Sequence, residues 1–230
     1  MQRYLQRSLQ QLSSAKSLYR LSLFIGCLSW LVLMAIARGQ SLVPVEYLTR
    51  DPATIADHPE YYGALSNIGV LLWNASAVVC LMGALQVRAM MSKVPSSYLK
   101  ISRESSPFLA SFGILSGILC LDDLFLLHES IIPNKLNLSE EVVFISYGIA
   151  LMCLLIRFRR LIVSTGPGAL LTSLLIFAIS ITADKSLPLT AITEQDGYLI
   201  EDGLKLLAIF LWLAYFVWTT LTLTTAHTHD

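Results

Sequence analysis

The feature that most constrains this chain is a series of apolar blocks, each close to the length that a helix needs to cross a membrane. An α-helix requires about 20 apolar residues to span the hydrocarbon core of a bilayer. None of the blocks shows the two-residue alternation of a barrel strand, so the pattern predicts helices. The six blocks cover, approximately, residues 21–37, 62–87, 107–129, 141–157, 167–184 and 198–225.

The composition agrees with a membrane protein. Hydrophobic residues make up 55% of the chain and charged residues only 14%, whereas a soluble domain carries about 25% charged residues. We therefore expect an all-α, polytopic bundle of six transmembrane helices that forms one domain over residues 21–225. Residues 1–20 place Leu5, Leu9 and Leu12 on one face, which predicts a short amphipathic helix on the membrane surface. Residues 226–230 remain as a short tail.

The positions of the basic residues predict the orientation of the bundle. Lys and Arg gather in residues 1–20, in the loop around 88–103 and in the loop around 157–160. With six spans these segments lie on one side, which the positive-inside rule makes cytoplasmic. Both termini are then cytoplasmic, and we expect the chain in the plasma (inner) membrane. The membrane lipids are its expected partners, with anionic lipid at the basic loops, and no nucleic-acid partner is expected.

Four ionisable residues stand near the outer end of the third block, in the segment LDDLFLLHES (residues 121–130): Asp122, Asp123, His128 and Glu129. A charged residue at the membrane centre costs about 2.5–3.5 kcal/mol on insertion scales, so such residues are rare and usually functional. If the helix continues to Glu129, a rotation of about 100° per residue places Asp122 and Glu129 on one stripe. Asp123 and His128 then flank this stripe.

The sixth block carries a second charged group, formed by Glu201, Asp202 and Lys205. Lys205 lies seven residues into its block, and Asp122 lies seven residues before the end of the third. At about 1.5 Å per residue both lie roughly 10 Å below the outer membrane boundary. A contact between Asp122 and Lys205 is therefore possible if the two helices are neighbours. Supporting polar residues are Asn67, Asn74, Tyr147 and Asp184.

Two further patterns concern helix packing. Gly113 and Gly117 form a small-residue pair on the face opposite Asp122, which predicts close approach of another helix. In the sixth block an inward stripe is expected at Glu201, Lys205, Ala208, Trp212, Tyr215 and Thr219. The four cysteines stand singly in different blocks, which is typical of buried free thiols.

The acids of this polar layer outnumber its one lysine. The excess charge must be neutralised by protons, by water or by a bound cation. The first hypothesis is an outward-facing site that binds or moves a cation, either a proton or a divalent metal. Carboxylates suit Ca²⁺ or Mg²⁺, and an added imidazole suits Zn²⁺ or Mn²⁺. The candidate metal ligands are Asp122, His128, Glu129 and Glu201.

Two other interpretations stay open at this point. A metal held by His128 and the acids could activate water in a membrane-embedded hydrolase for a lipid-like substrate, with Glu201 or Lys205 moving protons. Alternatively, the polar layer is purely structural, and its bonds across helices contribute about 0.6 kcal/mol each. The sequence leaves undecided whether the protein is an enzyme, which ion or substrate it takes, and its oligomeric state.

Overall fold

All regular structure that the computed structural model describes is helical, which confirms the all-α prediction. The structure describes residues 52–59, 61–91, 102–186 and 194–225, with scattered positions between 20 and 39, and it omits the side chains of 91, 102, 183–186 and 194–199. The predicted amphipathic helix (1–20) and tail (226–230) lie outside these residues, apart from Arg20. The predicted first span (21–37) lies only partly inside them. These three elements stay predictions.

The chain divides into two compact units, which are described separately. The first, Met1–Tyr62, includes the short helix α3 (Pro52–Ile55), followed by Asp57 in the left-handed backbone region with a φ of 54°. In this unit the ring of His58 stacks on Tyr62 with centroids 4.8 Å apart.

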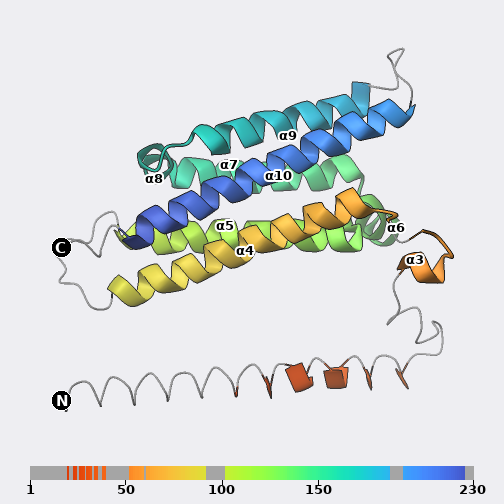
Figure 1. Ribbon diagram of the computed structural model, residues 1–230, viewed down its shortest axis with the longest axis horizontal. Helices are drawn as coiled ribbons and strands as arrows, with labels where there is room; N and C mark the ends of the chain where they lie inside the picture. Colours follow the sequence, from red (N-terminus) through yellow and green to blue (C-terminus); the bar gives the residue numbers. More distant parts are fainter. Residues whose placement is uncertain are drawn as a thin grey trace. The chain divides into compact units, whose positions relative to one another are not determined.

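The second unit, Gly63–Asp230, is a bundle of helices whose long axes run in similar directions (Figure 1). The turn η2 and helix α6 lie at one end of this bundle, and α8 lies at the other. Its elements are α4 (Ala64–Met91), α5 (Ser102–Phe125), the π-helical turn η2 (Leu127–Ile131), α6 (Ile132–Leu136), α7 (Glu140–Arg157), α8 (Arg159–Ser164), α9 (Gly168–Ser186) and α10 (Glu194–Thr225).

Three helices of the described chain are long and apolar enough to cross a membrane: α4, α5 and α10. A fourth span is possible only if η2–α6 and α7 act together, although these two parts are bent by 119°. The apolar part of α9, Gly168–Thr182, is shorter. Large apolar side chains on the outer faces are exposed, for example Leu71 and Trp218 at 65% each. The chain is therefore a membrane protein with three or four candidate spans in its described part.

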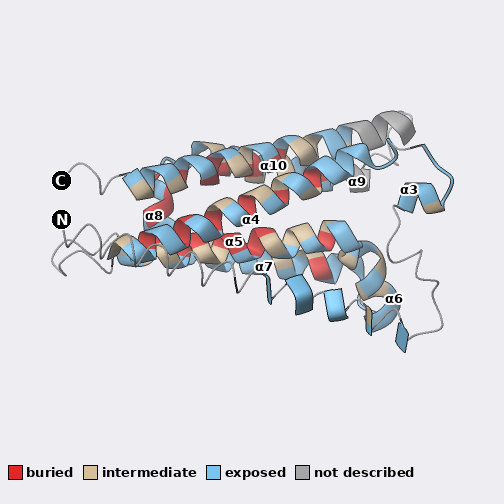
Figure 2. Cartoon of the chain, turned by 60° about the horizontal axis from the view of Figure 1, so that its bottom comes forward, coloured by how far each residue is buried: buried red, intermediate tan, exposed pale blue. Residues whose placement is uncertain are grey.

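The core lies where α4 meets α5 and α10, and Figure 2 shows buried residues along the facing sides of these helices. Gly113 on α5 makes close contact possible, because a Cβ built there would lie 2.9 Å from Cγ of Leu81 on α4. Gly83 on α4 has the same role toward α10, where the nearest atom, Cγ2 of Thr220, would be 2.6 Å away. The predicted close approach at Gly113 is confirmed.

The predicted inward stripe of α10 is buried along most of its length. Ala208, Trp212, Tyr215 and Thr219 are each at most 2% exposed. The indole Nε1 of Trp212 donates to Oγ of Ser116 on α5 at 3.0 Å. All four cysteines are free, but Cys27 and Cys153 are exposed, so the prediction of burial was wrong for these two.

We predict that Gly113→Ala destabilises the bundle, because the new methyl group would collide with Leu81 and with Cβ of Cys80, 3.0 Å away. Overpacking of this kind costs about 1–3 kcal/mol. Thermal unfolding in detergent measures the change. Gly203→Ala on α10 is the matched control, since its Cβ would meet no atom within 4 Å. That control should be neutral or stabilising, and equal losses for both variants would contradict close packing at Gly113.

Candidate cation site

The helix that carries the two aspartates ends earlier than its sequence predicts. Helix α5 stops at Phe125, and Leu126 adopts left-handed backbone angles with a φ of 51°. The chain then turns through η2, where the carbonyl of Leu126 accepts hydrogen bonds from the N–H groups of Ser130 and Ile131. The prediction of a continuous helix to Glu129 was therefore wrong, and the stripe shared by Asp122 and Glu129 does not exist.

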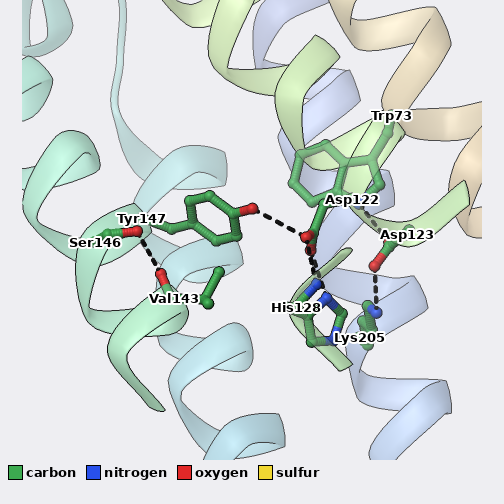
Figure 3. A network of polar contacts seen from close by, with 8 residues as sticks. All are labelled: Trp73, Asp122, Asp123, His128, Val143, Ser146, Tyr147 and Lys205. Atoms are coloured by element: carbon green, nitrogen blue, oxygen red, sulfur yellow. Dashed lines mark hydrogen bonds and ion pairs between the residues drawn. The ribbon is translucent and has the colours of Figure 1, made fainter. Parts of the chain in front are cut away.

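Because the chain turns at Leu126, His128 folds back onto Asp122. The backbone N–H of His128 donates to Oδ1 of Asp122 at 3.0 Å, and His128 Nδ1 lies 2.5 Å from Oδ2 (Figure 3). The first N–H groups of a helical turn have no partner within it, and carboxylates commonly accept from them. Asp122 thus caps η2 from the preceding helix. The hydroxyl of Tyr147 on α7 also donates to Oδ1 at 2.9 Å.

Asp123 points to a different pair of helices. Its Oδ2 accepts from Nε1 of Trp73 on α4 at 3.1 Å, and its Oδ1 accepts from Nζ of Lys205 on α10 at 2.9 Å. Successive residues of a helix point about 100° apart, so adjacent carboxylates can serve different neighbours. The lysine of α10 therefore pairs with Asp123, and the contact considered between Asp122 and Lys205 is replaced by this neighbouring pair.

Both carboxyl groups are largely shielded, with side-chain exposures of 4% for Asp122 and 11% for Asp123. If both are ionised and Lys205 is protonated, the network has a charge of −1 while His128 is neutral and zero when His128 is protonated. His128 lies in the turn beyond α5, and its hydrogen bond to Asp122 raises the pKa of the imidazole. Partial burial of the ring opposes this shift.

Asp122, Asp123 and His128 also form a possible metal-binding group. One ligand atom from each residue can be chosen so that all three lie within 4.8 Å of one another. This set shares Asp122 and His128 with the metal ligands expected from sequence and adds Asp123. The buried Asp/Asp/His group is therefore compatible with binding of a cation in a membrane protein.

Not all of the expected site residues are among these hydrogen-bonded groups. Glu129, Asn67 and Asn74 are exposed. Glu201 is half-buried, and its backbone carbonyl accepts from Ser180 Oγ. The side chain of Asp184 lies outside the described residues.

Asp202 is exposed and lines a cavity of about 30 Å³ together with Asp123 and Lys205. A cavity of at least about 10–15 Å³ can hold a water molecule, so this space is large enough for one. The network therefore borders a position where water or a small ion can reach Asp123.

One residue of the network, Trp73, was not expected from the sequence. The available signal was an indole N–H in the middle of an apolar span, since a buried tryptophan usually finds an acceptor. The sequence could not identify Asp123 as that acceptor, because the choice depends on how α4 packs against α5.

One comparison with known proteins identifies a family. The family model described as Domain of unknown function (DUF8692) matches residues 22–219. The chain belongs to this family. No curated protein and no solved structure matches it.

We predict that Leu126→Gly stabilises the turn and that Leu126→Val destabilises it. A left-handed residue other than glycine costs about 1–2 kcal/mol, and a branched Cβ increases the conflict. Thermal unfolding in detergent compares the variants. Leu124→Gly is the control, because Leu124 is similarly exposed but helical, and glycine in a helix costs about 1 kcal/mol. Equal effects of glycine at positions 124 and 126 would contradict strain at Leu126.

Proposed function

We propose that this protein binds a proton at the Asp122–His128 pair, from the end of the bundle where η2 lies. The observation that carries the proposal is the double contact of His128 with Asp122, through its backbone N–H and its ring. A proton on the imidazole strengthens the ring contact, and loss of that proton weakens it. Proton binding would thereby stabilise the turn η2, which lies between α5 and α7.

The charge of the network favours a proton over a divalent ion. With neutral His128, two carboxylates and Lys205 leave one negative charge, and a single proton brings the total to zero. A divalent ion would leave a buried excess of one positive charge, which is costly in a medium of low dielectric constant. The ammonium group of Lys205, 2.9 Å from Asp123, would also repel it.

The packing of the bundle supports binding more than conduction. Toward the end of α5 opposite Asp122, aromatic side chains pack closely, and Phe108 and Phe112 are completely buried. Phe112 packs against Trp212 and Phe216 with ring centroids 5.8 and 5.1 Å apart. A proton path through this part of the bundle would need polar groups that these rings do not supply.

A divalent metal is the second candidate, and the clustering of Asp122, Asp123 and His128 favours it. Zn²⁺ is bound by imidazole nitrogen and carboxylate oxygen at about 2.0–2.2 Å. A metal could bind Nε2 of His128 while Nδ1 keeps its contact with Asp122, or it could bind Nδ1 once that contact opens. A metal-dependent hydrolase would require a metal-bound state of this same site.

We predict that Asp122→Asn shifts the protonation of His128 to lower pH. Asp122 favours the charged imidazole, whereas partial burial of the ring disfavours it. The protein binds its proton as the pH falls and releases it as the pH rises, so loss of the carboxylate moves the midpoint downward. The measurement is a pH titration of ¹⁵N-histidine chemical shifts in nanodiscs, with His128→Gln to assign the signal.

Glu129→Gln is the matched control, because it removes an exposed carboxylate next to His128 in the chain. Its midpoint should stay near that of the unchanged protein. An unchanged midpoint in Asp122→Asn would contradict the proposal. If protein purified without chelators contains a near-stoichiometric amount of metal, the cation bound at this site is a divalent ion and not a proton.

For the membrane topology we propose six spans with both termini cytoplasmic, in the plasma (inner) membrane, and with the site toward the outer side. The placement of η2–α6 and α8 at opposite ends of the bundle supports opposite sides for these connections (Figure 1). Arg157, Arg159 and Arg160 are exposed near α8, where they would meet anionic lipid of the inner leaflet.

We predict that Lys135→Cys reacts with a membrane-impermeant maleimide in intact cells and that Arg160→Cys reacts only after permeabilisation. Both residues are exposed in connections at opposite ends of the bundle. The variants are made in a chain whose four native cysteines are replaced by alanine. Labelling of both positions from outside would contradict the proposed topology.

A further inference from the structure

Beside the aspartate network lies a second space of a different kind. A cavity of about 390 Å³ opens among α4, α5, α7, α9 and α10. This volume falls in the range of about 300–1,000 Å³ that is usual for small-molecule sites. Most of its lining is apolar and includes Trp73, Leu119, Leu151, Leu174, Phe177 and Trp212.

Two polar contacts join α7 to α5 beside the cavity. Near the middle of α7, Tyr147 bonds to Asp122. At the C-terminal end of α7, Arg157 pairs with Glu104 at 3.3 Å, and Phe158, which follows the helix, packs on Phe108. Between these contacts, Leu151 and Leu155 of α7 line the cavity.

Gly148 and Ala178 are the small residues of the cavity wall, on α7 and α9. A Cβ built at Gly148 would meet no atom within 4 Å. The space is therefore open at α7, and larger side chains at these two positions would occupy it.

Polar groups reach the cavity from the network. Asp122, Tyr147 and Lys205 belong to its lining. An ammonium group has three donors, and one of those of Lys205 points to Asp123. A carboxylate has about four acceptor positions, and Asp122 uses three, for the His128 N–H, the His128 ring and the Tyr147 hydroxyl. The lining thus offers spare donors on Lys205 and one spare acceptor position on Asp122.

We propose that this cavity binds one molecule of an uncharged amphiphile, with a single long apolar chain and a terminal hydroxyl group. The chain would lie among Leu119, Leu151 and Leu174. The hydroxyl oxygen would accept from Lys205, and its hydrogen would be donated to Asp122. When His128 is protonated the network carries no net charge, so a carboxylate or an ammonium head would bring an uncompensated charge into a largely apolar cavity, which is costly.

This site is separate from the proposed function, although both use Asp122. Proton binding needs only His128 and its contact with the carboxylate. Ligand binding depends on the apolar walls, which can be changed without touching the network.

The first test compares three probes that share one chain: 1-dodecanol, dodecanoate and dodecylammonium. The protein is purified in a bulky steroid detergent, and bound molecules are counted by native mass spectrometry during titration. We expect one molecule of 1-dodecanol to bind per chain. The two charged probes should bind at least about tenfold more weakly, because the site recognises a hydroxyl group by hydrogen bonds. No saturable binding of 1-dodecanol, or equal binding of all three probes, would overturn the proposal.

The second test fills the cavity. Ala178→Trp places an indole in the space and should abolish binding of 1-dodecanol. Ile179→Trp is the matched control on the same helix, since Ile179 is 47% exposed and does not line the cavity. This control should bind as the unchanged protein does.

Gly148→Phe fills the cavity from the opposite wall and gives a second reading if Ala178→Trp does not fold. Unchanged binding in a folded filling variant, or equal loss in Ile179→Trp, would overturn the proposal. The titration of His128 should remain unchanged in the filling variants. A failure of the ligand site is then distinguishable from a failure of the proton site.

Discussion

The arrangement of the polar site depends on two adjacent carboxylates at the end of α5 that accept hydrogen bonds from different neighbouring elements. Asp122 accepts from the turn η2 and from α7, and Asp123 accepts from α4 and α10. Two neighbouring residues therefore connect one helix end to four other elements. In an apolar surrounding each of these bonds satisfies a group that would be costly to leave unpaired.

Because the two carboxylates bond to different helices, two cavities of different kinds lie beside them. On the side of Asp123, a water-sized cavity next to Lys205 lies among α4, α5 and α10. On the side of Asp122, the hydroxyl of Tyr147 joins α7 to α5, and the length of the tyrosine side chain keeps these two helices apart. The larger apolar cavity lies in the gap that remains.

Much of the fold could be predicted from the sequence. The blocks predicted at 62–87 and 198–225 correspond to α4 and α10, and the close approach at Gly113 follows from a small residue in an apolar helix. The site was harder to predict. Asp122, Asp123, His128, Tyr147 and Lys205 stood out because polar groups are rare in apolar segments, but their partners did not follow. The break at Leu126 has no glycine or proline beside it, so a continuous helix was the natural expectation.

By itself, the sequence determined that the chain is helical, that it belongs in a membrane and that polar groups gather near one end of the third apolar block. These properties follow from local composition and from the cost of exposing apolar or charged groups to the wrong surroundings. Only the tertiary structure decided that His128 meets Asp122, that Lys205 meets Asp123 and that Glu129 meets neither. The reason is that a left-handed residue is unfavourable on its own and forms where contacts from outside the helix offset its cost. Here those contacts come from Asp122, six residues before His128, and from Tyr147 on another helix.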